Sequence, residues 1–309
     1  WSGDFSRVVV NAGLWLRANG SCGTPGTPGT PGTPGATQTA GPSTATRTAT
    51  ITRTSVATVT PGGPPYCALP QFGPDTEYAV GDGPQRSLVA DFNEDGNPDI
   101  AVVNRESGNL SVLLGNGNGG FAPATIYELD VQPTGITVGD YNSDDNLDLA
   151  ASGFGVKMAL ILLGNGAGGF GTATWYGSGS DSAGIATADF NLDGHDDMVV
   201  ADDGQDNMLV LINNGSGGFG VGVQYDLDWI PTDIAVGDFN RDGKPDVAAS
   251  NSFSDNVSVR LGNGTGGFGA LQNYSVGANP RSITIGDFNG DSNPDFATPR
   301  AETGSKPVR

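Results

Sequence analysis

Nine-residue segments rich in aspartate and asparagine recur along the chain, and their side chains are the ones best suited to do chemistry. The first begins at Asp91 and reads Asp-Phe-Asn-Glu-Asp-Gly-Asn-Pro-Asp. If the loop turns sharply, side-chain oxygens at positions 1, 3, 5 and 9 converge, and position 7 adds a backbone carbonyl. Five or more hard oxygens suit Ca²⁺ better than Mg²⁺, which holds its water more tightly. The segment therefore predicts a calcium loop.

Four related segments follow at equal intervals of 49 residues, beginning at Asp140, Asp189, Asp238 and Asp287. About five Ca²⁺ ions are therefore expected, and their binding would move the net charge from −20 to −10. At position 7 the expected ligand is the backbone carbonyl, including that of His195. The predicted metal ligands, loop by loop, are Asp91, Asn93, Asp95, Asn97 and Asp99; Asp140, Asn142, Asp144, Asn146 and Asp148; Asp189, Asn191, Asp193, His195 and Asp197; Asp238, Asn240, Asp242, Lys244 and Asp246; and Asp287, Asn289, Asp291, Asn293 and Asp295.

Two other interpretations of the loops are weaker. An EF-hand shares the opening spacing, but it needs a glutamate at position 12, where the first loop has Val102. Acidic turns without metal are also conceivable, because Asp, Asn and Gly are good turn formers. Three aspartates in one short loop would, however, repel one another without a cation. Position 6 is glycine in three loops, and Asp145 and Ser292 must adopt its left-handed conformation in the other two.

The elements that position these loops repeat with the same period. Apolar and small residues alternate before each loop, as in Ile234-Ala-Val-Gly237, and two short apolar runs follow it. A Gly-rich turn then ends at Phe121, with counterparts at Phe170, Phe219 and Phe268, and leads to a fourth run. Four short strands in 49 residues predict an all-β fold, a β-propeller of four-stranded blades with about five to six blades. The alternative is an open solenoid of β-meanders.

Composition excludes several classes of function. Acidic residues outnumber basic ones 34 to 14, so nucleic acid and anionic membrane surfaces are poor partners. No run of 18 apolar residues occurs, so no membrane insertion is expected. With one histidine, two cysteines and no visible pairing of a nucleophile with a base, the chain is not expected to be an enzyme.

The pattern Gly-Asp-Phe-Asn-x-Asp-Gly-x-x-Asp, with a Gly-Gly-Phe turn in each unit, resembles the FG-GAP or VCBS repeats of integrin alpha-chain propellers and of many bacterial secreted proteins. The resemblance covers residues 72 to about 300. It implies a calcium-loaded propeller outside the cell, used for adhesion, glycan binding or scaffolding. The five aspartate loops match the metal loop of that family position by position.

The repeat pattern breaks at both ends. The fifth repeat stops after its second strand, and residues 1–23 resemble the strands of a degenerate blade, with Val8–Asn11 similar to the second strand Ala101–Asn104. Residues 24–65 form a Thr/Pro/Gly-rich, low-complexity linker, and residues 66–309 are the predicted calcium-binding repeats. Cys22 and Cys67 belong to one inter-strand turn in the repeat register, which predicts a disulfide.

The expected function is that of a secreted or cell-surface protein with a structural or adhesive role. The N-terminal strands are expected to complete a blade of their own chain or of a neighbouring subunit, and repeated exchange would give an extracellular filament. The partners would then be further copies of the chain, an extracellular protein or a glycan. A glycan-binding propeller is the alternative, with Trp175, Tyr176, Tyr225 and Trp229 as stacking residues unless they pack between blades.

Overall fold

A computed structural model describes residues 7–13, 72–154, 159–177 and 181–299. The chain divides into two compact units, one formed by residues 9–76 and the other by residues 1–8 with 77–309. Strands β1 (Arg7–Gly13) and β2 (Phe72–Ala79) pair in a two-stranded sheet. Val8–Asn11, which resembles a second strand in sequence, lies within β1 and so beside β2. The predicted linker and the predicted Cys22–Cys67 disulfide lie outside the described residues.

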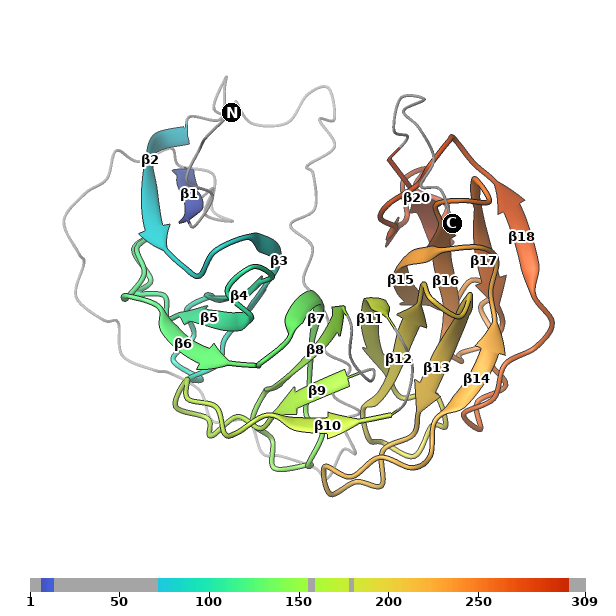
Figure 1. The fold of residues 1–309 in the computed structure, drawn as a ribbon, viewed down its shortest axis with the longest axis horizontal. Coiled ribbons are helices and arrows are strands. Elements are labelled where there is room, and N and C mark those ends of the chain that lie inside the picture. Colours follow the sequence, from blue (N-terminus) through green and yellow to red (C-terminus); the bar gives the residue numbers. More distant parts are fainter. Residues whose placement is uncertain (1–6, 14–71, 155–158, 178–180, 300–309) are drawn as a thin grey trace, which may run out of the picture. The chain divides into compact units, whose positions relative to one another are not determined.

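The larger unit contains four antiparallel sheets of four strands and a final sheet with two described strands. Within each sheet the strands follow the order of the chain, and they run from the inside of the fold to its rim (Figure 1). The four complete sheets are β3 (Pro84–Ala90), β4 (Asp99–Asn104), β5 (Asn109–Leu113) and β6 (Thr125–Glu128); β7 (Gln132–Gly139), β8 (Asp148–Phe154), β9 (Ala159–Leu162) and β10 (Thr174–Tyr176); β11 (Ser182–Ala188), β12 (Asp197–Asp202), β13 (Asn207–Leu211) and β14 (Val223–Asp226); and β15 (Pro231–Gly237), β16 (Asp246–Asn251), β17 (Asn256–Arg260) and β18 (Gln272–Ser275). The last sheet pairs β19 (Thr284–Gly286) with β20 (Asp295–Ala297).

The sequence explains which strands are buried. The second and third strands of each complete sheet are rich in Val, Leu, Ile, Met and Ala and are buried along almost their whole length, as in β12 and β13. The fourth strands mix polar and aromatic residues, and they are mostly exposed, as in β14. Apolar side chains of consecutive sheets pack together, so that Val112 of the first sheet shares a core with Leu160 of the second.

Consecutive sheets contact each other in two places, between their inner strands and at the rim. On the inside, the first strands β3, β7, β11, β15 and β19 contact one another in order. At the rim, a tyrosine of β6, β10 and β14 packs edge-on against the phenylalanine of the next Gly-Gly-Phe turn, as Tyr127 does with Phe170 at 5.7 Å between ring centroids. This succession of blades around inner strands is a β-propeller, so the predicted fold class is confirmed. No membrane-spanning helix is found among the described residues.

Candidate metal-binding loops

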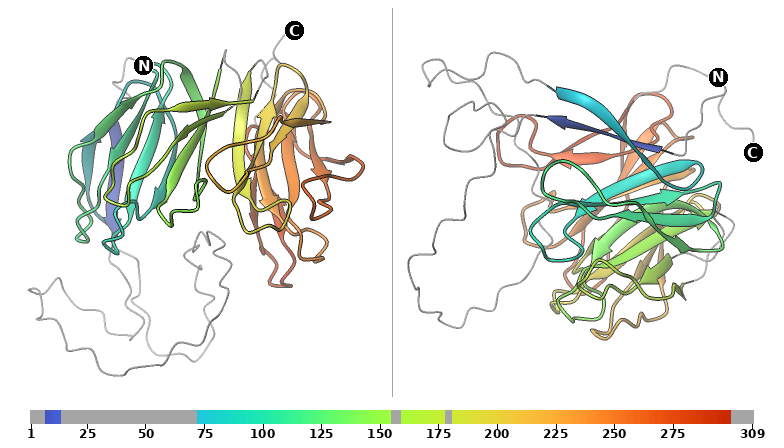
Figure 2. Two further views of the ribbon diagram at one scale, coloured as in Figure 1. Left: turned by 90° about the horizontal axis from the view of Figure 1, so that it is seen from below. Right: turned by 90° about the vertical axis from the view of Figure 1, so that its left-hand side faces the viewer.

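Each predicted calcium loop connects the first strand of a sheet to the second, so all five lie at the same end of their sheets (Figure 2). The backbone takes a left-handed conformation at position 6, with φ of 83° at Gly96 and 90° at Gly194. A Cβ at Gly96 would meet no other atom within 4 Å, so glycine is favoured there by conformation and not by lack of space. Asp145 at φ 68° and Ser292 at φ 65° take the same conformation, as the sequence required.

Backbone amides within the first loop point at the predicted ligands. Asp91 accepts hydrogen bonds from the amides of Asp95 at 3.2 Å and Gly96 at 2.8 Å. Asp95 in turn accepts one from the amide of Asn97 at 2.8 Å, and Asn93 accepts a second bond from the Asp95 amide. The side chains at positions 1, 3 and 5 are therefore gathered around one turn of backbone.

The same bonds recur in the other loops, including the two without glycine at position 6. In the second loop, Asp140 accepts from the amides of Asp144 at 3.1 Å and Asp145 at 2.9 Å. In the fifth, Asp287 accepts from the amides of Asp291 and Ser292. The loop shape thus follows from the spacing of the aspartates and does not depend on glycine.

The aspartate at position 9 connects the loop to the interior. Asp99 is completely buried and accepts hydrogen bonds from the amides of Phe92 at 2.8 Å and Gly115 at 2.7 Å. Gly115 begins the Gly-rich turn after the third strand, and a Cβ there would overlap the carbonyl oxygen of Pro98. Its counterparts Asp148, Asp197 and Asp246 are equally buried and bind the matching pairs of amides.

Burial and neighbouring carboxylates make the position-9 groups poor places for negative charge. Burial raises the pKa of Asp148 and of Asp197 to about 6, and the carboxylates at positions 1 and 5 raise it further against the opposing effect of the two amides. For Asp99 and Asp246 the pKa is also raised by burial. In these four loops the buried carboxylate at position 9 therefore carries its charge at a cost, which a bound cation would relieve.

The second loop contacts the third, and the fourth contacts the fifth, through positions 1, 4, 5, 7 and 8. The hydroxyl of Ser143, at position 4 of the second loop, lies 2.8 Å from Nδ1 of His195, at position 7 of the third. The carboxylate of Asp196 accepts a hydrogen bond from the amide of Asp140 at 3.0 Å. Arg241 of the fourth loop similarly donates to the carbonyl of Asp291 in the fifth. His195 therefore has a side-chain role that the sequence prediction, limited to its carbonyl, missed.

The donor set of each loop fits a hard divalent cation. It combines carboxylates at positions 1, 5 and 9 with an asparagine amide at position 3 and a backbone carbonyl at position 7, which are the oxygen ligands that Ca²⁺ takes. In the described residues, no three Asp, Glu, His or Cys side chains lie close enough together to hold an ion by themselves. The amide and carbonyl oxygens are therefore needed, and calcium binding stays a prediction.

The four aromatic residues considered for glycan stacking fall into two pairs. Tyr176 and Tyr225 pack edge-on against Phe219 and Phe268 of the following blades, so their rings serve the inter-blade contact. Trp175 and Trp229 are 43% and 53% exposed.

Comparison with known families decides what kind of repeat this is. The FG-GAP-like repeat family matches residues 91–151, 189–249 and 238–298, which together cover more than half of the chain. The chain belongs to the FG-GAP-like repeat family. Each matched FG-GAP-like stretch begins at the first aspartate of a loop and reaches the second strand of the following sheet. No curated protein sequence matches the chain.

Solved structures support the propeller fold of this FG-GAP-like chain. It is similar to streptogramin B lyase, with 17% identity, a TM-score of 0.51 and coverage of 74% of both chains. A protein from Lactobacillus plantarum gives 15% identity, a TM-score of 0.52 and coverage of 70% of this chain and 64% of that one. The periplasmic gluconolactonase PpgL of Pseudomonas aeruginosa gives 16% identity, a TM-score of 0.52 and coverage of 70% of this chain and 63% of that one. The chain thus spans less than two thirds of the last two proteins, and at these identities the likeness concerns the fold alone.

Proposed function

We propose that the protein is a secreted, calcium-stabilised β-propeller with a structural or adhesive role. The observation that carries the calcium part is the fivefold recurrence of one oxygen-rich loop, in which backbone amides gather the carboxylates at positions 1 and 5 and the asparagine amide at position 3 around a single turn. A divalent cation would be held by positions 1, 3, 5, 7 and 9, and it would supply the charge that offsets their repulsion. Because such an ion binds the folded loop only, it stabilises the fold by mass action.

Calorimetry with defined metal content tests this proposal. We expect about five Ca²⁺ per chain by elemental analysis, a lower Tm in excess EDTA, and recovery of the Tm with Ca²⁺ but less with Mg²⁺ at equal concentration. Asp189→Asn should remove one ion, whereas Glu128→Gln, a matched change on the exposed strand β6, should remove none. An unchanged Tm after elemental analysis has shown complete metal removal would refute the stabilising role.

The structural role rests on the strand count. The last sheet has two described strands, β19 and β20, and β1 with β2 forms a separate two-stranded sheet. Tyr78 of β2 packs on Phe121 at 5.5 Å between centroids and accepts a hydrogen bond from the Phe121 amide, as Tyr127 does with Phe170. By this register β2 is the fourth strand of the blade that precedes the first complete one. In a closed ring, that blade is the one begun by β19 and β20.

We infer that β1 and β2 complete the blade of β19 and β20, either in the same chain or in a neighbouring copy. Exchange between copies would repeat head to tail and give a filament. Negative-stain microscopy and sedimentation over a wide range of protein concentrations in millimolar Ca²⁺ separate the two outcomes. Regular filaments that fray in EDTA would support exchange. Isolated discs at every concentration would rule out the filament and leave closure within one chain.

Glycan binding is the second candidate, and the exposure of Trp175 and Trp229 favours it. Trp229 lies against Phe253 with 5.4 Å between ring centroids, so its half-exposed indole belongs to an aromatic pair. A glycan array with the intact chain should show binding that Trp229→Ala abolishes. The same array with Tyr225→Ala, which alters an inter-blade ring, controls for a general loss of fold. We propose no catalytic activity for the chain.

A further inference from the structure

A pocket at the end of the propeller opposite the aspartate loops is lined by arginine and by no acidic residue. Its volume is about 690 Å³, and its lining comes from five blades. Three of the six basic residues whose side chains are described lie there: Arg86, Arg105 and Arg281. In a chain with 34 acidic residues and a net charge of −20, such a concentration of positive charge is the feature least expected from composition.

The pocket is built from one repeated position. Gln85, Thr134, Ala183, Thr232 and Arg281 are separated by 49 residues each, and all five line it. They lie at or just before the start of the first strands β3, β7, β11, β15 and β19, which are the inner strands of the fold. The pocket therefore opens on the inner strands, where the repeat brings equivalent residues of the five blades together.

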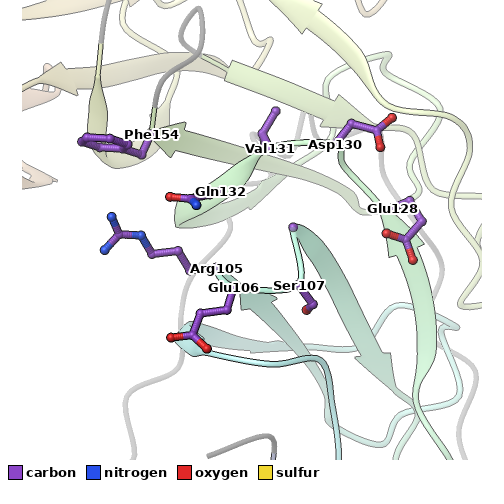
Figure 3. A pocket seen from close by; sticks show the side chains of 9 residues that line it. Arg105, Glu106, Ser107, Glu128, Asp130, Val131, Gln132 and Phe154 are labelled. Atoms are coloured by element: carbon purple, nitrogen blue, oxygen red, sulfur yellow. The ribbon is translucent and has the colours of Figure 1, made fainter.

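Two of the three guanidinium groups have no acceptor in the described part of the protein. Arg86 donates to Asp233 at 2.6 Å, so one positive charge is neutralised. Arg281 makes no such bond. The guanidinium of Arg105 lies 5.4 Å from the centre of the Phe154 ring. Figure 3 shows it directed toward Phe154 and away from Glu128 and Asp130, which line the adjoining pocket.

The backbone around Arg281 is fixed before any ligand arrives. The carbonyl of Pro280 accepts a hydrogen bond from the hydroxyl of Thr232 at 3.0 Å. The amide of Ile283 donates to Asp233 at 3.0 Å, so the same carboxylate that holds Arg86 also holds the Arg281 segment. Because the backbone that carries Arg281 is already held in place, less entropy is lost when the site binds a ligand.

We propose that this pocket binds a small organic anion through a phosphate or carboxylate group held between Arg281 and Arg105. Guanidinium groups pair with both kinds of oxyanion in a forked geometry, and both arginines have unused donors. The hydroxyl of Ser282 and the side-chain amide of Gln85 supply neutral donors around them, whereas the hydroxyls of Thr134 and Thr232 already donate to backbone carbonyls. The volume suits a ligand the size of a sugar phosphate or a sugar acid.

Isothermal titration of the intact, calcium-loaded chain at low ionic strength tests the proposal. Glucose 6-phosphate and glucuronate are the charged probes, and glucose is the uncharged control of the same size. We expect saturable 1:1 binding of at least one charged probe, weakening as salt is added, and no binding of glucose. The absence of binding by both charged probes, or equal binding of glucose, would overturn the proposal.

Single substitutions place the binding in the pocket. Arg281→Gln and Arg105→Gln should each weaken binding by tenfold or more, while Arg281→Lys should retain part of it. Neither change breaks an internal hydrogen bond of the described structure, so both variants should keep the Tm of the original chain. Arg260→Gln removes the same charge from β17, outside the pocket, and should leave affinity within twofold. A loss as large for Arg260→Gln as for Arg281→Gln would show that only net charge matters, and would refute the site.

Discussion

Arg86 and Asp233 occupy the same position of the repeat in two different blades and form an ion pair with each other. They are 147 residues apart, three times the 49-residue period, and their charged groups meet at 2.6 Å between Nη1 and Oδ1. Asp233 is 4% exposed, and it also accepts hydrogen bonds from the amides of Ile234 and Ile283. The repeat therefore does not make the blades equivalent on the inside of the fold, since opposite charges stand at one repeated position.

The first prediction concerns this pair. Arg86→Leu leaves the carboxylate of Asp233 buried without its cation. We expect the free energy of unfolding to fall by about 1–3 kcal/mol. This is less than the cost of breaking a fully buried ion pair, because the Arg86 side chain is a third exposed. Asp233→Asn in the same chain removes the unpaired charge but keeps one of the two amide bonds, so it should recover part of that loss. Urea unfolding of the two single variants and the double variant measures the coupling. Additive effects would show that the two groups do not stabilise each other.

A second prediction separates the two roles of the loop aspartates. In EDTA, Asp197→Ala should destabilise by about 2 kcal/mol or more, because the amides of Phe190 and Asn213 lose their acceptor in the interior. Asp193→Ala should cost little in EDTA, since Asp193 accepts from the amide of His195 in an exposed turn. In Ca²⁺ both variants should lose stability relative to the original chain. Equal Tm values for the two variants in EDTA would contradict the structural role of position 9.

The third prediction is a pH dependence outside the loops. Burial raises the pKa of Asp203 to about 6, and the nearby carboxylates of Asp181, Asp202 and Asp206 raise it further. Because this folded-state value lies above the ordinary value of 3.8, the ionised group destabilises the fold at pH 7. That penalty should fall as pH drops through 6 and disappear below about 4.

Asp203→Asn should therefore stabilise the protein at pH 7, by about 1 kcal/mol once solvent screening of this half-buried group is allowed for. The gain should shrink as the pH falls from 7 to 4. Thermal unfolding of both proteins in EDTA across this range measures it, with Glu128→Gln as a change of the same charge at an exposed position. A gain that does not vary with pH would mean that the shift of the Asp203 pKa plays no part.

A fourth prediction tests the rim contacts between blades. Tyr127→Phe removes the hydroxyl that accepts a hydrogen bond from the amide of Phe170 at 3.2 Å, and it should cost about 1 kcal/mol. Tyr274 holds the same position of the repeat, but its hydroxyl contacts only Gln272 at the surface, so Tyr274→Phe should change stability by less than about 0.5 kcal/mol. Urea unfolding at fixed Ca²⁺ compares them. Equal costs would show that the hydroxyl bond between blades adds nothing.

The sequence predicted what depends on local pattern and period. Strand β15 lies where alternation from Ile234 to Gly237 placed it, and Asp145 and Ser292 adopt the left-handed conformation that position 6 demands. The family match confirms the resemblance drawn from the aspartate loops and Gly-Gly-Phe turns. These features follow from residue types within a few positions of one another, so a single sequence with internal repeats carries them.

Long-range relationships were not predictable in the same way. The hydrogen bond from the amide of Gly115 to Asp99 joins residues 16 apart. Because almost every residue has a backbone amide, the residue type does not reveal which amide is the donor. The pairing of Arg86 with Asp233 depends on how far the blades turn about the inner strands. The contact of Ser143 with His195 needs the spacing between neighbouring loops. A repeat period fixes which residues are equivalent, but it does not fix which of them meet.

The crowding around Asp233 restricts how such a chain can evolve. The position it shares with Arg86 is glycine in the second and third blades, and a Cβ at Gly184 would come within 2.9 Å of the Asp233 carboxylate. Copying the first unit over the fourth, or the fourth over the first, would set two like charges against each other, and copying either over the second or third would place a side chain where only glycine fits. The inner residues thus fix the order in which the units can follow one another. New variants are therefore expected to arise by point substitution at the rim and not by exchange of whole units.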